Sequence, residues 1–321
     1  MTGSPQPSTQ RPKRPRSWLS RHRRVRTVVY TLYALLAAPF VILPLPLFLL
    51  PKTIVYGIAR RLGMCIAYPL TRRKTRANLF HAFGGRMTER RADALARKVA
   101  ANTFYWLADV VYLWVFARWL RWDDIVVSFE NRQTVVDILA SGKGLVVATP
   151  HYGSFEIIAA HFIQVLHVTG GVIARSFPSP FMNWLYRKAR MRQNVPSYYD
   201  QVRDVMRVLK HNGVIGVLPD LRAKRRLGVP TTFFGKPTLT FDIHVRLAGH
   251  ARALIIPAFL MRHKRRPWQH TMVCREPIIV PPKSPDETIH AITQQINDAF
   301  EWHLRRYPSG WMWFNNKWRL W

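Results

Sequence analysis

The chain has 321 residues, enough to bury a large core as one domain with appendages. Its 49 lysines and arginines outnumber 17 aspartates and glutamates, and the net charge of +32 predicts an anionic partner. The two cysteines, Cys65 and Cys274, have no metal-ligand spacing, which excludes a disulfide framework and a zinc site and indicates a reducing compartment. The sequence carries no helix-turn-helix, zinc-finger or RNA-binding signature, so nucleic acid is not the expected partner.

The first quarter of the chain is its most basic part. Residues 1–88 contain no acidic residue and 16 basic ones, which is half of the net charge. Residues 1–26 are rich in Pro, Ser, Gln and Arg, and we predict a disordered basic tail. Residues 28–50 follow as 23 uncharged residues. We therefore predict a membrane-anchoring helical segment over residues 27–62, held on an anionic membrane by the basic residues around it.

Two arrangements of the apolar run 28–50 remain open. The run is long enough to span a bilayer, but Pro39, Pro44 and Pro46 each remove a backbone hydrogen bond that lipid cannot replace. Basic residues flank the run on both sides, so a single span would leave one cluster outside, against the positive-inside tendency. We favour a segment that dips into the cytoplasmic leaflet over one that spans.

Residues 63–321 are predicted to form one α/β domain. Residues 89–120 have a helical pattern rich in aromatic residues, which indicates either a core helix or one whose Trp and Tyr rings lie at the lipid headgroups. Further helices are expected at about 131–140, 155–166, 180–192, 202–210, 241–249 and 286–306, and strands at 144–149, 171–174, 214–218, 254–260 and 272–280. Gly235 and Pro237 are expected to shape a turn before a helix that starts near Thr240. The alternation predicts a mixed, mostly parallel central sheet with helices on both faces.

The stretch GLVVATPHYGSFE, residues 144–156, contains the strongest candidate for chemistry. His151 follows a buried strand at its carboxyl end, where open α/β sheets gather their functional groups. Ser154 is a good N-cap for the helix that follows, and Glu156 lies in its first turn. A carboxylate that holds an imidazole in one tautomer makes it a general base, so we predict that Glu156 orients His151. The plainer alternative is a loop histidine beside an acidic residue at a helix start.

Two other predicted strands also end in polar residues. Arg175 follows one strand, and Asp220 follows another, so both are expected to meet His151 in one crevice. A basic run comes directly after Asp220 and consists of Arg222, Lys224, Arg225 and Arg226. Arginine binds phosphate or carboxylate bidentately, and we predict Arg175, Asp220, Arg222, Arg225 and Arg226 as substrate-binding residues. The alternative for the run 222–226 is a solvated basic loop.

Four blocks occur in a combination that points to a known family: HYGSFE, GVIAR before a Pro-rich loop, LPD before FFGKPTLT, and YPSGWMWFNNKWR near the C-terminus. Over about residues 28–320 the chain resembles the lipid A biosynthesis acyltransferase family (lauroyl/myristoyl type) of the glycerolipid-acyltransferase-like superfamily. The family often has Asp-Gln where this chain has Asp220 and Leu221. It often has His and Arg near the ending where this chain has Asn315 and Asn316.

The resemblance implies a membrane-bound acyltransferase at the bacterial inner membrane, with the catalytic domain 63–321 facing the cytoplasm. It would move a fatty acyl chain from an acyl thioester, acyl carrier protein or coenzyme A, to a hydroxyl of a phosphorylated glycolipid, most directly a lipid A precursor of lipopolysaccharide. His151 would be the general base and Glu156 its orienting carboxylate, with no metal or redox cofactor. The sequence has no Gly-x-Ser-x-Gly nucleophile elbow that would indicate a covalent acyl-enzyme. The alternatives are another bacterial acceptor such as a phosphatidylinositol mannoside, or a non-catalytic basic membrane-binding protein.

Overall fold

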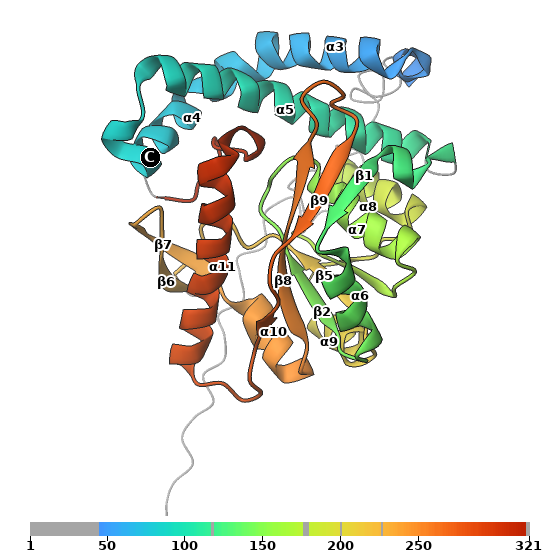
Figure 1. Cartoon of the computed structure of the whole chain (residues 1–321), viewed down its shortest axis with the longest axis vertical. Coiled ribbons are helices and arrows are strands. Elements are labelled where there is room, and N and C mark those ends of the chain that lie inside the picture. The colour runs from blue at the N-terminus through green and yellow to red at the C-terminus, as the bar shows by residue number, and fades with distance from the viewer. Residues whose placement is uncertain (1–44, 117–118, 176–179, 200, 226, 319–321) are drawn as a thin grey trace, which may run out of the picture.

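The computed structural model describes residues 45–116, 119–175, 180–199, 201–225 and 227–318 (Figure 1). An eight-stranded sheet forms its centre, and a two-stranded hairpin lies apart from this sheet. The strands of the central sheet are β1 (Val126–Glu130), β2 (Leu145–Ala148), β3 (Gly170–Ile173), β4 (Ser197–Tyr198), β5 (Val214–Val217), β8 (Leu254–Arg262), β9 (His270–Cys274) and β10 (Ile278–Ile279).

The central sheet is mixed and mostly parallel, as the sequence predicts. Its order is β1-β9-β8-β2-β5-β3-β4, and β10 pairs with β8. β2 runs parallel to both of its neighbours, and its last residue, Ala148, pairs with Val217 of β5 and Pro257 of β8. β3 runs parallel to β5 and β4, whereas β9 and β10 run antiparallel to β8. The carboxyl ends of β2, β3, β5 and β8 therefore share one edge, which we call the carboxyl edge.

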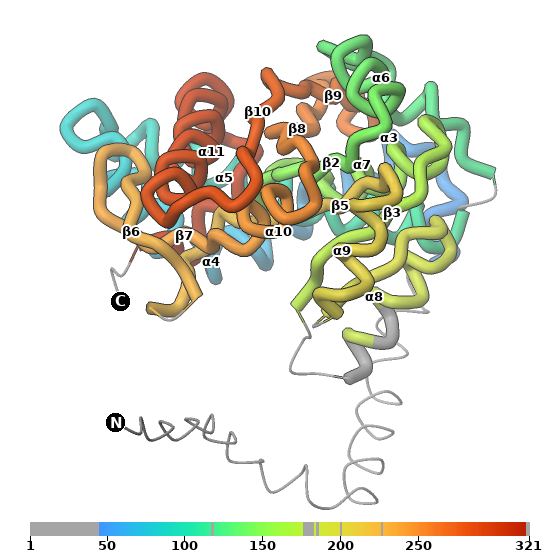
Figure 2. Tube along the Cα trace, turned by 90° about the horizontal axis from the view of Figure 1, so that it is seen from below, coloured from blue at the N-terminus to red at the C-terminus, as the bar shows by residue number. Residues whose placement is uncertain are grey.

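Helices cover both faces of this sheet, which confirms the predicted layering (Figure 2). Side chains of a strand alternate between the two faces. Leu145 and Val147 of β2 accordingly pack in a core with α6 and α7, while Val146 and Ala148 pack in the other core with α9, α10 and α11. The helices of the α/β part are α6 (Arg132–Ala140), α7 (Phe155–Val165), α8 (Pro180–Arg192), α9 (Val202–Lys210), α10 (Ile243–Ala251) and α11 (Asp286–Arg306), with short turns η5 (Trp122–Asp124) and η6 (Pro308–Gly310).

The N-terminal helices form a layer across one end of the sheet, at the top of Figure 1. They comprise η1 (Leu45–Leu49), α3 (Lys52–Leu62), the π turn η2 (Gly63–Ala67), α4 (Tyr68–Phe83), η3 (Gly84–Arg86) and α5 (Glu89–Val115). Thr88 caps α5 by accepting the Arg91 N–H. Gly63 allows the close approach to α5, because a Cβ atom there would lie 2.7 Å from the Ala100 carbonyl oxygen.

The aromatic second half of α5 is a core helix on the side that meets α3 and α7. Tyr112 is buried in a cluster with Tyr56 of α3, and the two rings are stacked with centroids 6.1 Å apart. Trp106 stacks on Phe155 of α7 at 5.7 Å. The core interpretation is therefore confirmed for these rings, while Leu107 on the same helix is 45% exposed.

The expected helix start near Thr240 is wrong. Thr240 lies in β7 (Lys236–Phe241), which pairs with β6 (Gly228–Phe233) in a hairpin, and α10 begins only at Ile243. The two loop residues, Phe234 and Gly235, both have positive φ angles, 54° and 68°, as the tight turn of a two-residue hairpin requires. The burial pattern of β6 alternates, which is typical of a half-buried strand.

The predicted tail and most of the predicted apolar run, residues 1–44, lie outside the described residues. Within the part of the chain that the structure describes, no helix is long and apolar enough to cross a membrane. The membrane-anchoring segment 27–62 therefore stays a prediction for its first part. Its last part, residues 45–62, forms η1 and α3 on top of α5.

Candidate active site

The loop after β2 is shaped by its contacts with neighbouring strands. The Thr149 N–H donates to the Val217 carbonyl and so extends the pairing of β2 with β5 by one residue. Gly153 has a φ angle of 55°, and a Cβ atom there would lie 2.3 Å from the Leu260 carbonyl oxygen of β8. Only glycine fits both demands, and the chain then enters α7 at Phe155. The loop thus holds His151 at the carboxyl edge.

Asp220 is the carboxylate that contacts His151. It follows β5 as His151 follows β2, and the two strands are paired neighbours that end level with each other. The Asp220 side chain is fully buried and accepts three hydrogen bonds. His151 donates two of them, from Nδ1 to Oδ1 at 2.7 Å and from its backbone N–H to Oδ2 at 2.9 Å. Trp311 Nε1–H donates the third to Oδ2 at 2.8 Å.

These contacts fix the tautomer of His151. Burial raises the pKa of Asp220, but the charge of His151 and the hydrogen bonds from His151 and Trp311 outweigh it, so the pKa lies below its usual range. An ionised carboxylate only accepts, so Nδ1 carries the ring proton and the Nε2 lone pair is left for a substrate. Burial lowers the pKa of His151, but the charge and hydrogen bond of Asp220 and the charge of Glu156 raise it above its usual value of 6.5. The imidazole side chain is 23% exposed.

The predicted role of Glu156 is therefore corrected. Its two oxygens accept from one guanidinium, Oε2 from Arg190 Nε at 3.0 Å and Oε1 from Arg190 Nη2 at 2.7 Å. Both side chains are largely buried, at 10% and 14% exposure. Glu156 points along α7 toward α8, and its effect on His151 is that of a nearby charge. Arg190 was not predicted from the sequence, because only the fold brings α8 beside the first turn of α7.

Ser154 precedes α7 as predicted, but its side chain does not cap the helix. Its hydroxyl donates instead to Asp109 Oδ2 of α5, and Arg262 Nη2 donates to both Asp109 Oδ2 and Ser154 Oγ at 2.5 Å. The Tyr56 hydroxyl of α3 donates to the other oxygen of Asp109. A buried polar network therefore joins α3, α5 and the end of β8 to the residue that lies three positions after His151.

The C-terminal segment forms one wall of the site. The Met312 N–H donates to the His151 carbonyl oxygen at 3.1 Å, and the Gly153 N–H donates to the Gly310 carbonyl oxygen at 2.9 Å. A Cβ atom at Gly310 would lie 2.3 Å from the Tyr152 ring, so only glycine permits this pairing. The sequence hinted at this segment through its tryptophans, but nothing in their spacing shows that Trp311 binds a carboxylate 91 residues away.

Lys317 secures the same segment from the other side. Its fully buried Nζ donates to Thr240 Oγ1 at 3.1 Å and to Asn297 Oδ1 at 3.3 Å. Burial lowers the pKa of Lys317 to about 8, with the charge of Asp220 opposing the shift. The lysine thus ties the segment to the β6–β7 hairpin and to α11, and both hold the Trp311 side of the site in place.

A narrow apolar cavity of about 30 Å³ lies between α7 and the strands β2, β3 and β5. Phe155 and Thr149 line it near the loop that carries His151, and the Glu156–Arg190 pair closes one side. The Phe155 and His151 rings also form a T-shaped pair, with centroids 5.2 Å apart. The cavity holds no more than one or two water molecules at this size, so any larger occupant needs the side chains around it to shift.

The other predicted substrate-binding residues follow the strands β3 and β5 in the sequence. Arg175 is exposed, and its guanidinium lies 5.5 Å from the centroid of the Phe241 ring. Arg222 is half-buried, and its backbone N–H donates to the Asn316 carbonyl oxygen. Arg225 is exposed, while Arg226 lies outside the described residues. Their binding to a substrate stays a prediction.

Among the described residues, no group of three or more His, Cys, Asp and Glu side chains has the arrangement of a metal site. Cys65 is exposed and Cys274 is buried, and both are free thiols. The chemistry available at the carboxyl edge is that of a positioned imidazole with an ionised carboxylate behind it. Such a pair accepts a proton at Nε2 from a hydroxyl and stabilises the resulting imidazolium.

Two comparisons with known proteins gave a match to this chain. A family model described as bacterial lipid A biosynthesis acyltransferase matches residues 20–320. The crystal structure of the 1-acyl-sn-glycerophosphate acyltransferase PlsC from Thermotoga maritima is 16% identical in sequence, with a TM-score of 0.36. That comparison covers 81% of this chain and 99% of the other. No curated protein matches the chain significantly.

Proposed function

The chain belongs to the bacterial lipid A biosynthesis acyltransferase family, and from that premise we propose that it transfers a fatty acyl chain to a hydroxyl of a membrane glycolipid. The proposed donor is an acyl thioester of acyl carrier protein or coenzyme A, and the first proposed acceptor is a lipid A precursor. The observation that carries the proposal is the hydrogen bond of 2.7 Å between His151 Nδ1 and the fully buried Asp220. It leaves Nε2 as the proton acceptor.

The proposed reaction needs one base and no covalent enzyme intermediate. Nε2 of His151 takes the proton of the acceptor hydroxyl while the hydroxyl oxygen forms a bond to the thioester carbonyl carbon. The tetrahedral oxyanion then collapses, the carbon–sulfur bond breaks, and the thiolate takes the proton back from the imidazolium. The products are an ester and a free thiol. Asp220 stabilises the imidazolium between these steps, and general-base help of this kind contributes roughly 10²–10⁴-fold in rate.

Trp311 and the backbone of the loop support the same step. Because Asp220 Oδ2 accepts from Trp311 and from the His151 backbone, the carboxylate cannot rotate without breaking two hydrogen bonds. It therefore presents Oδ1 to the imidazole in one geometry, which is the preorganisation that a general base requires. We assign the stabilisation of the oxyanion to a backbone amide or to Arg175.

The basic residues at the same edge fit the charge of the proposed substrates. Lipid A precursors, coenzyme A and acyl carrier protein are all anionic, and the net charge of +32 attracts each of them. We assign Arg222, Arg225 and Arg226 to a phosphate of the acceptor or donor, because they follow Asp220 directly in the sequence. The apolar cavity beside Phe155 is where the start of an acyl chain fits best, once the side chains of α7 move apart.

The location that this function requires is a membrane surface, and we place the chain on the cytoplasmic face of the bacterial inner membrane, where acyl thioesters are available. No metal or redox cofactor enters the proposed step, since the base and the thioester supply all that it needs. An acceptor other than a lipid A precursor, such as a phosphatidylinositol mannoside, would use the same base in the same way.

The test is a transfer assay with the purified chain. The chain is incubated with an acyl thioester and a lipid A precursor, and mass spectrometry follows the acceptor. The proposal predicts a mass gain of one acyl group and an equal amount of free thiol, both abolished in His151→Ala. Thiol release that does not need His151, or no acylated lipid with any acceptor, would overturn the proposal. The melting temperature of the variant should stay within a few degrees of the parent, because a strand-end loop side chain contributes little packing.

A further inference from the structure

The charged side chain of Lys317 is enclosed by the protein. Among the residues that the structure describes, it is the only lysine or arginine that is fully buried. Its Nζ donates to Thr240 Oγ1 at 3.1 Å and to Asn297 Oδ1 at 3.3 Å, and it lies 4.8 Å from the centroid of the Phe233 ring. Burying a charge costs free energy, so a fully buried ammonium is expected to have a charged partner.

The hydrogen bonds of the lysine cluster, which consists of Lys317, Thr231, Thr240 and Asn297, do not require a positive charge. Thr240 Oγ1 accepts from Lys317 and from Asn297 Nδ2 at 2.9 Å. Its own proton therefore goes to Thr231 Oγ1 at 2.8 Å, and Lys317 has to donate. A neutral amine or an amide has two N–H groups and can donate both bonds that Lys317 makes, at a lower cost of burial. The feature that distinguishes lysine from such a side chain is its charge.

Ring contacts join Lys317 to the site. The Phe233 ring beside Nζ also packs against the Trp311 ring, with centroids 5.7 Å apart. The Trp311 indole in turn donates to Asp220 at 2.8 Å. Lys317 and Asp220 therefore lie on opposite sides of the same pair of aromatic rings.

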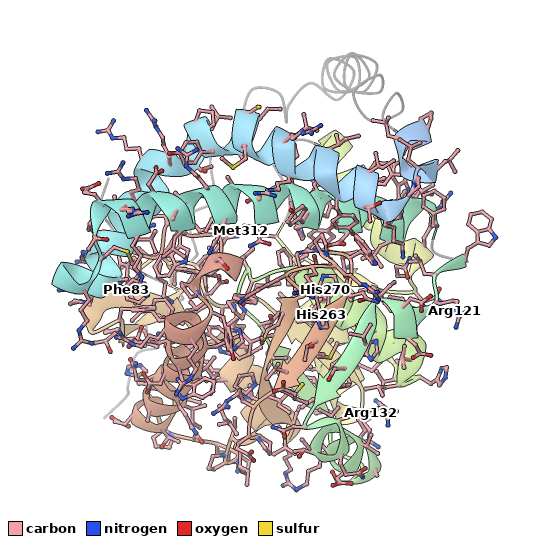
Figure 3. All side chains as sticks on the ribbon, turned by 45° about the horizontal axis from the view of Figure 1, so that its top comes forward. Phe83, Arg121, Arg132, His263, His270 and Met312 are labelled. Carbon is pink, nitrogen blue, oxygen red and sulfur yellow. The ribbon has the colours of Figure 1, made fainter. Side chains whose placement is uncertain are left out.

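The backbone between Lys317 and the site is fixed at both ends. Thr238 Oγ1 donates to the Lys317 carbonyl oxygen at 2.5 Å, and the Met312 N–H donates to the His151 carbonyl oxygen at 3.1 Å. Met312 is buried, and Figure 3 shows it just below α5. A segment held in this way keeps the distance between the Lys317 charge and the site constant.

Asp220 is a buried charge of the opposite sign, and its side chain is as fully buried as that of Lys317. Charges inside a protein act over longer distances than charges in water, because solvent and salt screen them less. Burial lowers the pKa of Lys317 to about 8, and the charge of Asp220 opposes this shift. The amine is therefore mostly protonated at pH 7 and forms a balanced pair of charges with Asp220.

The other ionisable groups around the lysine cluster do not supply this balance. Asp242 and Glu301 form ion pairs with Arg246 and Arg305. Burial lowers the pKa of His244 to about 4, with Asp242 opposing the shift and Lys317 adding to it, so His244 is neutral at pH 7. The groups that border the cluster are Asp220 and Arg222 after β5, Lys236 of β7, Asp242 and His244 at the start of α10, and Glu301 of α11.

We propose that Lys317 is a positioning residue, whose buried charge balances that of Asp220 and so keeps His151 neutral before the reaction. The inference rests on the proposed acyl transfer, because a general base has to be neutral to accept the proton of a hydroxyl. Asp220 by itself favours the imidazolium, and a ring that stays protonated cannot act as the base. The positive charge of Lys317 disfavours the imidazolium, while the ring contacts keep Trp311 on Asp220.

The pKa of His151 is the readout, because a merely structural role of Lys317 would not change it. It is measured by NMR on the full chain labelled with ¹⁵N-histidine, without substrate, and the His151 signals are those that disappear in His151→Ala. Lys317→Gln removes the charge and keeps an amide that donates. Lys317→Arg keeps the charge. The matched control is Thr238→Val, which removes a hydrogen bond from the Lys317 backbone and leaves the charge in place.

The proposal predicts that the pKa of His151 rises by about half a unit or more in Lys317→Gln and keeps the parent value in Lys317→Arg and Thr238→Val. The kcat/KM of Lys317→Gln should fall about threefold at acid pH, which is the fold-change of half a pH unit, and recover at alkaline pH. The parent should show a second, smaller change of the His151 signals near pH 8, where Lys317 loses its charge. This last measurement needs no variant to fold.

Three results would overturn the proposal. They are an unchanged His151 pKa in folded Lys317→Gln, an equal shift in Thr238→Val, and a parent titration without a change near pH 8. Because the NMR titration uses no substrate, failure of the proposed function is distinguishable from failure of this inference. A chain that shows the predicted shifts but acylates no lipid would refute acyl transfer and keep the effect of Lys317 on His151.

Discussion

The substitution Asp220→Asn best distinguishes the role of Asp220 from that of Glu156. Asp220 Oδ2 accepts two N–H donors, from the His151 backbone at 2.9 Å and from Trp311 Nε1 at 2.8 Å, while Oδ1 faces the imidazole. An asparagine has only one oxygen. The two donors hold it at the Oδ2 position, because the reversed amide would set an NH₂ group against two other N–H groups. The NH₂ group of the asparagine must then face His151 Nδ1.

In this geometry His151 can no longer act as a general base. A donor at Nδ1 forces that nitrogen to accept, so the ring proton moves to Nε2, which can no longer take a proton from a hydroxyl. The corresponding substitution in a serine-protease triad lowers kcat by about 10⁴-fold through the same change of tautomer. We expect a loss of about 10³-fold or more here, with a smaller effect on KM. The free energy of unfolding should fall by about 1–3 kcal/mol, because three hydrogen bonds to a charged carboxylate become weaker bonds with a neutral amide.

The pH dependence gives a second measure of the same substitution. The base must be neutral to accept a proton, so kcat/KM rises with pH through the pKa of His151. Asp220 raises this pKa above 6.5, and the acid midpoint of the parent should lie above that value. Without Asp220, burial lowers the pKa with less opposition, so the midpoint of the residual activity should move below 6.5.

Initial rates of thiol release from an acyl thioester, measured across about pH 5 to 9, report both effects. A variant that keeps the kcat and the acid midpoint of the parent would refute the assignment of Asp220. A variant that loses activity together with its folded structure, seen as a lost thermal transition, would leave only the structural role of the carboxylate and would equally contradict the tautomer argument.

Three further substitutions test the neighbouring contacts. Glu156→Gln leaves the largely buried Arg190 without a charge partner, so it should lower the free energy of unfolding by about 3 kcal/mol in a denaturant titration and change the acid midpoint only slightly. Trp311→Phe removes one hydrogen bond from the Asp220 carboxylate and should lower kcat roughly tenfold. Trp313→Phe is its control, because this indole donates to a backbone carbonyl instead, and equal losses would assign the effect to packing. Arg225→Gln should raise KM for a phosphorylated acceptor and reduce its salt dependence, with a smaller loss in kcat.

Much of the α/β domain follows from local patterns in the sequence. The helix over residues 202–210 and the helix over 286–306 begin and end at the predicted residues, and the strand after Gly144 lies where its apolar run predicts. These elements bury one side or both faces, so their hydrophobic period survives in the sequence. β1 and the β6–β7 hairpin escaped prediction. Proline and threonine weaken the apolar alternation of the hairpin, although its two-residue loop at Phe234 and Gly235 was a usable signal.

Local sequence patterns could not predict which carboxylate forms a hydrogen bond with His151. Glu156 lies five positions away in the sequence and Asp220 lies 69 positions away, so spacing alone favours the wrong carboxylate. Asp220 is the partner of His151 because β2 and β5 are neighbours in the sheet. Glu156 binds Arg190 instead. Strand order in a parallel sheet depends on crossover connections, which leave no local mark in the sequence. The partner of Trp311 could not be predicted either, because it depends on how the C-terminal segment packs against the His151 loop.

The central claim is that His151 drives acylation of a bacterial lipid, and lipid analysis of cells tests it most directly. Mass spectrometry would compare lipid A and total lipid extracts from parent cells, from cells without this chain, and from cells that carry His151→Ala at equal protein level. The account predicts that lipid A lacks one acyl chain in the second and third samples alike. A lipid profile that is the same in all three samples would contradict it.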